Sequence, residues 1–511
     1  HTIRTLGGLS GFPCRDESPH DAYGTGHSST SISAALGLVE ARRLAPRPDG
    51  DPGRVVAVIG DGALTGGMAY EALNHAGHLG SPLLVVLNDN AMSIERNVGA
   101  MSNYLSRLRT DPKLYRFRRD LERRLQGLPA VGERVAVLGG QLKGAIKAAL
   151  VPGMLFEELG FTYVGVIDGH DIDELRFSLR RALAVEGPVL LHCRTVKGKG
   201  YEPAERHPGR YHGVPPSPTG NGNGEKGNPE GPTTYTRAFG EALVALAEED
   251  ERIVGITAAM AGGTGLDLLQ KTYPQRFFDV GIAEPHAVGF AAGLAAEGRR
   301  PVVAIYSTFL QRAYDQIIHD VCLQHLPVVF AVDRAGLVGE DGPTHHGAFD
   351  LSFLRIIPDL TLFVPKDEAE LQRLLATALT LDGPAVIRYP RSAGVGVPLE
   401  RPITAIAGPW VEVLSRGEDV ALLALGPGVG LCEEAAALLA ERGVGATVAN
   451  VRRVHPLDID AICELATSHR VLMTIEDNAL AGGFGSAVIE LLSDRGILVP
   501  VTRIGLPDSF V

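Results

Sequence analysis

Short apolar runs rich in Val, Ile and Leu recur along the whole chain, and they constrain the fold more than any other feature. Eight of these runs are residues 55–59, 83–87, 189–192, 253–256, 302–306, 328–332, 420–425 and 471–475. They lack polar alternation, which is typical of strands buried on both faces of a parallel sheet. Ala-rich helical stretches lie between them, at residues 69–76, 371–379 and 433–441. This alternation predicts an α/β fold with doubly wound, mostly parallel sheets.

The chain has 511 residues, enough for about two to four domains. Residues 213–232 are rich in Gly, Pro and Asn and contain little that could pack, so they are expected to form a linker. A softer break lies near residues 391–409. We therefore predict three α/β domains, at residues 1–232 (with the linker at the end), 233–400 and 401–511. The polar, Arg-rich segment 110–150 receives no functional interpretation.

The overall charge and the cysteines limit the possible classes of function. Lys and Arg total 48 against 60 Asp and Glu, a net charge of −12, which argues against a protein that coats nucleic acid. No run is long and apolar enough to span a membrane, and we expect no secretory signal. The five cysteines show no C-x-x-C spacing, which favours reduced thiols in the cytoplasm.

Polar residues follow two of the predicted strands. Gly60, Asp61, Gly62 and Ala63 come after the run 55–59, and Asn90 closes an Asn-Asp-Asn motif after the run 83–87. Asp61 and Asn90 are 29 residues apart, the length of one strand–helix–strand crossover. Such a crossover brings both loops to the same sheet edge. An acid, an amide and a loop carbonyl suit Mg²⁺ that also binds phosphate. A simple Asp-Gly turn is the alternative.

These motifs resemble those of thiamine diphosphate enzymes of the transketolase type. Longer segments narrow the resemblance to the 1-deoxy-D-xylulose-5-phosphate synthase family, and it extends along nearly the whole chain. The segments that carry it are 24–35 (GTGHSSTSISAA), 59–77, 87–99 (LNDNAMSIERNVG), 198–205 (GKGYEPAE), 304–316 (AIYSTFLQRAYDQ), 333–350 and 388–391 (RYPR).

The resemblance implies a transferase that depends on thiamine diphosphate and Mg²⁺ and works as a homodimer. Pyruvate would lose CO₂, and its remaining two carbons would join D-glyceraldehyde 3-phosphate to give 1-deoxy-D-xylulose 5-phosphate. That product serves isoprenoid, thiamine and pyridoxal synthesis. No nucleic acid or membrane partner is implied.

The matching positions imply roles for individual residues around the cofactor. The metal ligands would be Asp61, Asn90 and the Met92 carbonyl. The cofactor would further contact Gly26, His27, Ser28, Gly62, Ala63, Asn90, Tyr201 and Glu284.

Glu284 is a lone carboxylate within a run of small and apolar residues, 279–293. A buried acid is costly without a partner, so Glu284 could simply cap the helix that begins near Pro285. The resemblance implies instead that Glu284 is catalytic, through a hydrogen bond to the aminopyrimidine ring of the cofactor. Pro285 stands where the family usually has Gln, and we expect a proline tolerated at a helix start.

Arg334 and Arg391 each follow an apolar run, and guanidinium groups suit phosphate recognition. For either residue alone, a surface salt bridge is the simpler interpretation. The resemblance assigns both to the triose phosphate, with Tyr306, Asp341 and His345 nearby and His345 also catalytic. His346 replaces a Gln that is usual in the family.

Other functions stay open at this point. Transketolase is the nearest alternative, followed by the first component of pyruvate dehydrogenase and by a relative that binds the cofactor with little turnover. The segment 425–430 (LGPGVG) resembles a dinucleotide fingerprint, but residues 447–451 lack the acid that such a site requires.

The family has a segment that precedes the residues resembling 1–8 (HTIRTLGG) and carries histidines that serve in proton transfer. None of the 16 histidines here matches them. Because a positioned acid or base contributes about 10²–10⁴-fold in rate, we expect a polypeptide of these 511 residues to bind thiamine diphosphate but to turn over slowly.

Overall fold

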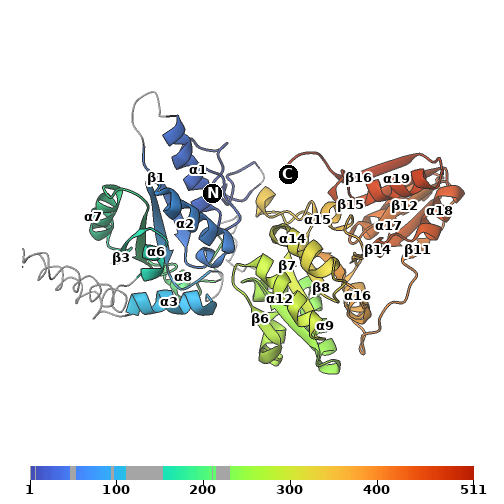
Figure 1. Cartoon of the computed structure of the whole chain (residues 1–511). Helices are drawn as coiled ribbons and strands as arrows, with labels where there is room; N and C mark the ends of the chain where they lie inside the picture. Colours follow the sequence, from blue (N-terminus) through green and yellow to red (C-terminus); the bar gives the residue numbers. More distant parts are fainter. Residues whose placement is uncertain are drawn as a thin grey trace, which may run out of the picture. The chain divides into compact units, whose positions relative to one another are not determined.

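The computed structural model describes residues 2–5, 7–45, 53–93, 97–110, 153–209, 211–213 and 231–511. Contacts divide the chain into two compact units (Figure 1). Unit 1 comprises residues 1–26 and 213–511, and unit 2 comprises residues 27–212. Most of the expected linker and nearly all of the segment 110–150 lie outside the described residues. The three-domain boundaries stay a prediction.

Unit 2 is built on a parallel sheet with the strand order β1-β2-β4-β3. Its strands are β1 (Val55–Gly60), β2 (Leu83–Asp89), β3 (Thr162–Asp168) and β4 (Val189–Arg194). One face is covered by α1 (Ser31–Leu44), α2 (Gly67–Leu79), α3 (Gly99–Thr110) and α6 (Met154–Glu158). The helix α7 (Ile172–Leu183) covers part of the other face. The short helices η1 (Ala63–Thr65) and α8 (Glu202–Arg206) follow β1 and β4 in the chain.

The expected burial on both faces is wrong for β1. The side chains of Val56 and Val58 are 43% and 62% exposed. β1 lies at the edge of the sheet, and α7 packs against β3 and β4 rather than over β1. One face of this strand is therefore accessible, although its sequence is as apolar as that of a central strand.

The central sheet of unit 1 has the order β14-β9-β10-β8-β7-β5-β6, and β14 alone runs antiparallel to its neighbour. Its strands are β5 (Ile253–Thr257), β6 (Phe277–Asp279), β7 (Arg300–Tyr306), β8 (Val329–Ala335), β9 (Thr361–Phe363), β10 (Ala385–Pro390) and β14 (Arg453–His455). One face packs against α9 (Tyr235–Glu249), α11 (Asp267–Thr272) and α16 (Glu368–Thr380).

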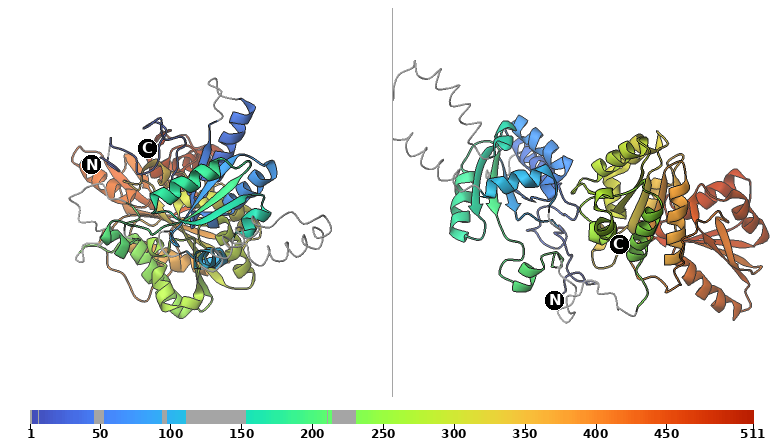
Figure 2. Two further views of the ribbon diagram at one scale, coloured as in Figure 1. Left: turned by 90° about the vertical axis from the view of Figure 1, so that its left-hand side faces the viewer. Right: turned by 90° about the horizontal axis from the view of Figure 1, so that it is seen from below.

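The other face of the central sheet packs against α12 (Glu284–Ala296) and a chain of short helical segments. These segments are α13 (Ser307–Leu310), η3 (Gln311–Ala313), α14 (Tyr314–Gln316) and η4 (Ile317–Cys322). The remaining short helices are α10 (Ala261–Thr264), η2 (Pro274–Arg276), η5 (Gly342–Thr344) and α15 (Asp350–Leu354). Figure 2 shows these elements from two further directions.

The last part of unit 1 is a five-stranded sheet of order β11-β13-β12-β15-β16, parallel except for β11. Its strands are β11 (Val411–Ser415), β12 (Val420–Ala424), β13 (Ala446–Val451), β15 (Val471–Ala479) and β16 (Val501–Leu506). Its helices are α17 (Gly428–Ala440), α18 (Ile459–Ser468) and α19 (Phe484–Asp494). The LGPGVG segment leads from β12 into α17, so it connects a strand and a helix of this sheet.

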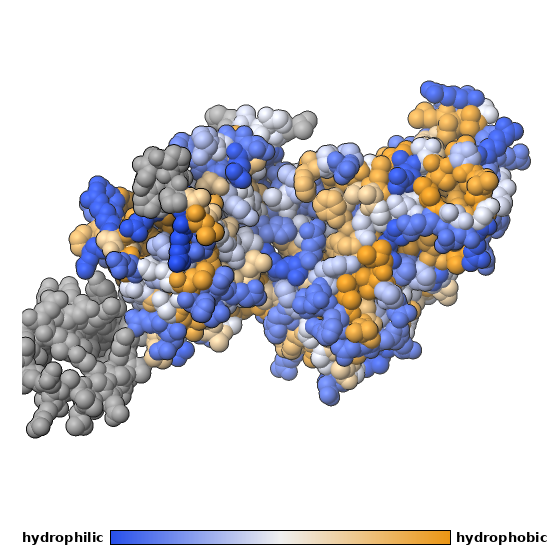
Figure 3. Space-filling view, turned by 45° about the horizontal axis from the view of Figure 1, so that its top comes forward, coloured by the Kyte–Doolittle hydropathy of each residue, from blue (hydrophilic) through white to orange (hydrophobic). Residues whose placement is uncertain are grey.

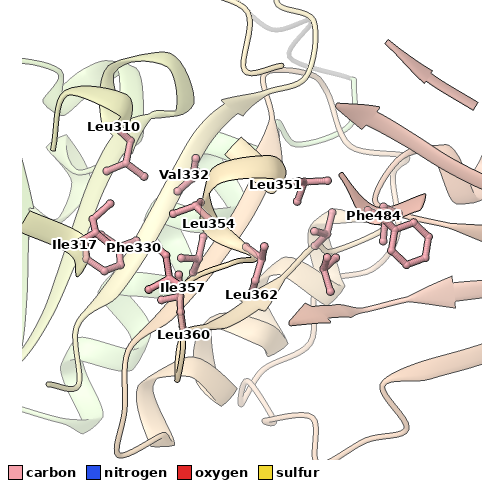
Figure 4. Close-up of a cluster of buried hydrophobic side chains, with 14 of the residues drawn as sticks. Leu310, Ile317, Phe330, Val332, Leu351, Leu354, Ile357, Leu360, Leu362 and Phe484 are labelled. Carbon is pink, nitrogen blue, oxygen red and sulfur yellow. The ribbon is translucent and has the colours of Figure 1, made fainter. Parts of the chain in front are cut away.

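The two sheets of unit 1 share one hydrophobic core (Figure 4). Phe330 of β8 and Leu351 of α15 belong to the same buried cluster as Phe484 of α19. The predicted second and third domains are thus packed together, which fixes the loops at the carboxyl end of the central sheet. All eight predicted strands and the three predicted helices are present.

The helices, the surface and the cysteines can be compared with the expectations from the sequence. Across the described part of the chain, no helix combines the length and the apolar character needed to cross a membrane. Figure 3 shows hydrophilic residues spread over the visible surface, with hydrophobic groups between them. All five cysteines are free thiols, as their spacing predicts.

Candidate functional site

The loops that follow β1 and β2 meet at the carboxyl edge of the sheet, as the crossover rule predicts. Gly60 pairs with Asn88, and the backbone N–H of Asp61 donates to the Asn88 carbonyl at 3.2 Å. The Asp61 carboxylate in turn accepts from the backbone N–H of Ala91 at 2.8 Å and of Asn90 at 3.5 Å. Asp61 and Asn90 therefore lie in one cluster.

The loop after β2 folds tightly around this carboxylate. The Asn90 side-chain oxygen accepts from the Met92 backbone N–H at 3.0 Å. Ala91, between them, has a φ of +64°, a left-handed conformation that few residues with a side chain adopt. A Cβ at Gly62 would lie 2.9 Å from the Cβ of Ser93, so only glycine allows this close approach.

Asp61 is 3% exposed, and the adjacent Asp89 is fully buried. Burial raises the pKa of Asp61 to about 7, and the hydrogen bond to Asp89 and repulsion from its carboxylate act in the same direction. A divalent cation would favour the ionised form of Asp61. Among the described residues, no group of three or more His, Cys, Asp or Glu could hold a metal, so a cation bound by Asp61 would also need amide or carbonyl oxygens. Asn90 and Met92 offer these, and the set fits Mg²⁺.

Two further segments that carry predicted cofactor residues are hydrogen-bonded to this cluster. The Ser29 hydroxyl donates to the Ala63 carbonyl at 2.7 Å, which ties the loop carrying His27 and Ser28 to the loop after β1. The Thr195 hydroxyl donates to the Asn88 side chain at 2.6 Å, so the segment that leads to Tyr201 also reaches the cluster.

Two of the predicted cofactor residues differ from the others. Tyr201 is largely exposed, and Gly26 belongs to unit 1. The Tyr201 side chain is 57% exposed and meets Tyr211 edge to face, with their ring centroids 5.6 Å apart. Gly26 belongs to unit 1, where a Cβ would lie 2.5 Å from the Cβ of Thr344. The close approach to Thr344 requires glycine at this position.

Glu284 is the first residue of α12 and is 2% exposed. The N-cap position belongs to Ala283, so Glu284 does not occupy the cap position that the alternative interpretation gave it. A guanidinium nitrogen of Arg312 lies 3.4 Å from the Glu284 carboxylate. Burial raises the pKa of Glu284, while Arg312 acts in the opposite direction. Pro285 occupies the first turn of the helix, as expected.

The predicted substrate residues gather at the carboxyl end of the central sheet. The guanidinium carbon of Arg334 lies 3.6 Å from the centroid of the Tyr306 ring. Arg334 has a φ of +63° and also pairs with the buried Asp333 at 3.1 Å. The Tyr306 ring stacks on Phe309, with the centroids 5.6 Å apart.

The N-terminal loop completes this substrate cluster. The His345 ring meets Phe309 at a centroid distance of 5.4 Å and stacks on Phe12 at 4.8 Å. The Arg4 guanidinium lies 5.3 Å from the centroid of Phe12 and pairs with Asp341. Asp341 also pairs with Arg391 at 3.3 Å.

All five predicted substrate residues therefore belong to one chain of contacts. Four residues near the two predicted catalytic residues were not predicted from the sequence: Arg4, Phe12, Phe309 and Arg312. Phe309 and Arg312 lie inside the segment 304–316 that carries the resemblance, and this was the available signal. Arg4 and Phe12 lie in an irregular loop that offers no periodic pattern.

A buried ion pair between Arg388 and Asp350 lies next to the substrate cluster and helps to position it. The guanidinium of Arg388 donates to Asp350 at 2.7 Å and to Asp477 of β15 at 2.6 Å. Asp350 also accepts from the hydroxyl of Ser307 at 2.8 Å, and Ser307 follows Tyr306 directly. The five-stranded sheet thus contributes to the position of the substrate cluster.

Comparisons with known proteins cover the whole chain. A family model described as 1-deoxy-D-xylulose-5-phosphate synthase matches residues 1–195. Models described as the transketolase pyrimidine binding domain and the transketolase C-terminal domain match residues 232–395 and 410–511.

Individual relatives agree with these family models. A 1-deoxy-D-xylulose-5-phosphate synthase of Desulforudis audaxviator is 57% identical over 512 residues, covering 100% of this chain and 80% of the relative. 1-Deoxy-D-xylulose-5-phosphate synthase 1 of Geobacter sulfurreducens is 54% identical, with the same shares covered. A solved split-gene transketolase, an inactive beta4 tetramer, is 33% identical with a TM-score of 0.50, and covers 55% of this chain and 91% of its own.

Proposed function

The chain belongs to the 1-deoxy-D-xylulose-5-phosphate synthase family, and we propose that it joins two carbons of pyruvate to D-glyceraldehyde 3-phosphate with loss of CO₂. The observation that carries this proposal is the identity of 57% over the entire chain. The matched length includes the metal loops, the Glu284 helix and the substrate cluster. The product, 1-deoxy-D-xylulose 5-phosphate, would serve isoprenoid precursor synthesis.

The proposal assigns the residues of unit 2 to the metal and the diphosphate. Thiamine diphosphate, when bound, supplies a nucleophilic carbon and an electron sink. Asp61, Asn90 and the Met92 carbonyl would hold Mg²⁺, because they already share one hydrogen-bonded loop cluster. The loops 26–28 and 62–63 would offer backbone groups to the diphosphate, with Tyr201 beside the cofactor.

Glu284 would bind the aminopyrimidine ring of the cofactor. Its carboxylate is almost fully buried, so a proton shared with a ring nitrogen would be exchanged away from water. The raised pKa means that Glu284 can hold a proton more readily than an exposed carboxylate, whereas Arg312 keeps the ionised form accessible. Both properties suit a group that moves a proton during catalysis.

The substrate cluster would bind the triose phosphate. Arg334 and Arg391 offer guanidinium forks that match the oxygens of a phosphate. The His345 ring is held between Phe12 and Phe309, which fixes its orientation. His345 would donate a proton to the aldehyde oxygen as the new carbon–carbon bond forms, and Tyr306 and Asp341 would hold the substrate beside it.

Release of CO₂ from pyruvate tests this function. With Mg²⁺ and thiamine diphosphate present, we expect the rate to rise strongly when D-glyceraldehyde 3-phosphate is added. Asp61→Ala and Glu284→Gln should both abolish this rise. Asp61→Ala should also abolish binding of thiamine diphosphate, which calorimetry measures. Transfer from a ketose phosphate, without CO₂ release, would instead identify a transketolase.

We further propose that the enzyme is a homodimer of the cytoplasm. Five free cysteines support a reducing compartment, and the family resemblance supports the dimer. Light scattering of the purified protein should give twice the chain mass of 54.1 kDa. A mass of one chain at micromolar concentration would contradict the dimer.

A further inference from the structure

Four polar side chains form a buried path across the sheet of unit 2. Asp61 directly follows β1, Asp89 ends β2, His192 lies in β4 and Tyr163 lies in β3. This sequence of residues reproduces the spatial order of the strands, β1-β2-β4-β3. The exposed fraction of each residue is 3% or less. The path therefore runs from the candidate metal loops to β3, the edge strand opposite β1, and each of its side chains is shielded from solvent.

His192 joins the inner part of this path. Its Nε2 lies 2.9 Å from a carboxylate oxygen of Asp89, and its Nδ1 lies 2.7 Å from the Tyr163 hydroxyl. With Asp89 ionised, a neutral imidazole satisfies both contacts when Nε2–H donates to Asp89 and Nδ1 accepts from the tyrosine O–H. The two partners thus fix both the ring orientation and its tautomer.

Asp89 joins the path to the metal loop. Its other carboxylate oxygen accepts from the Ala91 backbone N–H at 3.3 Å, and the same N–H donates to Asp61 at 2.8 Å. Ala91 lies between Asn90 and Met92, the two other ligands expected for the metal. The strained left-handed conformation of Ala91 is therefore held by both carboxylates at once.

Packing alone does not account for these residues. Burying a polar side chain costs free energy unless its hydrogen bonds are satisfied, and leucine or valine would fill a sheet core at lower cost. The two side-chain hydrogen bonds of His192 connect it to Asp89, which contacts the metal loop, and to Tyr163, which fixes the orientation of the ring. We propose that Asp89, His192 and Tyr163 are positioning residues for the Mg²⁺ ligands. This inference rests on the metal site of the proposed function.

The path acts by fixing the Asp89 carboxylate. His192 holds one oxygen of Asp89, so the other oxygen is directed at Ala91. Without His192, the carboxylate could rotate and release the loop 90–92. Partners outside the ligand shell typically contribute about 10- to 100-fold to metal affinity, and the same range is expected here.

Mn²⁺ binding in the presence of thiamine diphosphate, followed by electron paramagnetic resonance, tests the proposal. His192→Phe keeps a ring but removes both hydrogen bonds, and should weaken Mn²⁺ binding about 10- to 100-fold. His192→Gln should recover most of this loss, because its amide N–H can still donate to Asp89. Tyr163→Phe removes only the outer contact and should cause a smaller, several-fold loss.

A matched variant separates positioning from general destabilisation. Phe156 is fully buried and stacks on Tyr163 at a centroid distance of 5.9 Å, but it lies outside the polar path. Phe156→Leu should lower the melting temperature and leave Mn²⁺ affinity unchanged. If Phe156→Leu weakens Mn²⁺ binding as much as His192→Phe does, the proposal is overturned.

Two further results also test whether His192 and Tyr163 position the metal ligands. Unchanged Mn²⁺ affinity in His192→Phe overturns the positioning role, and if that variant does not fold, unchanged affinity in Tyr163→Phe overturns it instead. Asp61→Ala distinguishes this failure from a failure of the metal assignment. If Asp61→Ala also binds Mn²⁺ as the wild type does, the metal site itself is wrong.

Discussion

The Nε of Arg388 lies 2.7 Å from the Asp350 carboxylate, and both side chains are buried in the core of unit 1. Arg388 comes from β10 and Asp350 from the start of α15, so their ion pair joins the sheet to the loop before that helix. This loop carries Asp341 and His345. The orientation of the substrate cluster therefore depends on a buried pair that does not itself belong to the cluster.

Asp350→Ala should destabilise the protein by about 3–5 kcal/mol, because it leaves the Arg388 guanidinium without its fully buried carboxylate partner in the core. The free energy of unfolding in urea measures this loss. Asp494→Ala, at the exposed end of α19, is the control and should have little effect. Adding Arg388→Met to an Asp350→Leu variant should restore much of the stability. A double variant as unstable as Asp350→Ala would contradict this explanation.

Glu284→Gln should leave thiamine diphosphate bound but slow the exchange of its reactive carbon-bound proton. The amide cannot take up the proton that the carboxylate holds, while its size and burial are nearly the same. Proton exchange measured by NMR after quenching reports this step directly. Glu297→Gln, at the exposed end of the same helix, should exchange at the wild-type rate. Wild-type exchange in Glu284→Gln would leave Glu284 a structural residue.

Arg391→Ala should raise the KM for D-glyceraldehyde 3-phosphate more than the KM for pyruvate. Only the first of these substrates carries a phosphate, and Arg391 lies in the cluster with Asp341 and Arg4. Steady-state kinetics with each substrate varied in turn measures the ratio. Arg416→Ala removes an exposed arginine elsewhere and should change neither KM. Equal increases in both KM values would argue against phosphate binding by Arg391.

Asp333 should make stability depend on pH. Burial raises its pKa from 3.8 to about 6, although Arg334 and Thr236 partly offset this effect. The folded state then binds more protons than the unfolded state between these pH values, so the contribution of Asp333 to stability falls as pH rises from about 4 to about 6.

The Asp333→Asn variant isolates this contribution. Relative to the wild type, its free energy of unfolding should rise by up to about 3 kcal/mol over that pH interval and then stay level. Urea unfolding at a series of pH values gives the difference. A constant difference from pH 4 to pH 7 would show that Asp333 titrates alike in the folded and unfolded protein.

The sequence predicts those features that follow from local pattern and strand connection. Asp61 and Asn90 meet because one right-handed crossover between parallel strands admits no other arrangement of their loops. The strands that the sequence analysis missed include β14, whose three residues are defined by pairing with β9, and β16, which is largely exposed. Neither contains a continuous buried apolar run.

The rest of the site depends on contacts between distant segments. Arg4 and Asp341 are 337 residues apart, and the pair forms only because the irregular N-terminal loop packs against the segment of unit 1 that carries Asp341. His192 reads as the end of an apolar run, whereas its partner Asp89 lies 103 residues away. The error at β1 has a similar origin, since its sequence does not show that the strand lies at the edge of its sheet. Tertiary packing decides each of these cases.

The identity of the product tests the central claim most directly. Pyruvate labelled with carbon-13 at its carbonyl carbon is incubated with the purified protein, Mg²⁺, thiamine diphosphate and D-glyceraldehyde 3-phosphate, and the products are followed by carbon-13 NMR. We predict that the label appears at the ketone carbon of 1-deoxy-D-xylulose 5-phosphate, even if turnover is slow. Label that stays in pyruvate, or appears only in acetaldehyde or acetate, would contradict the proposed function.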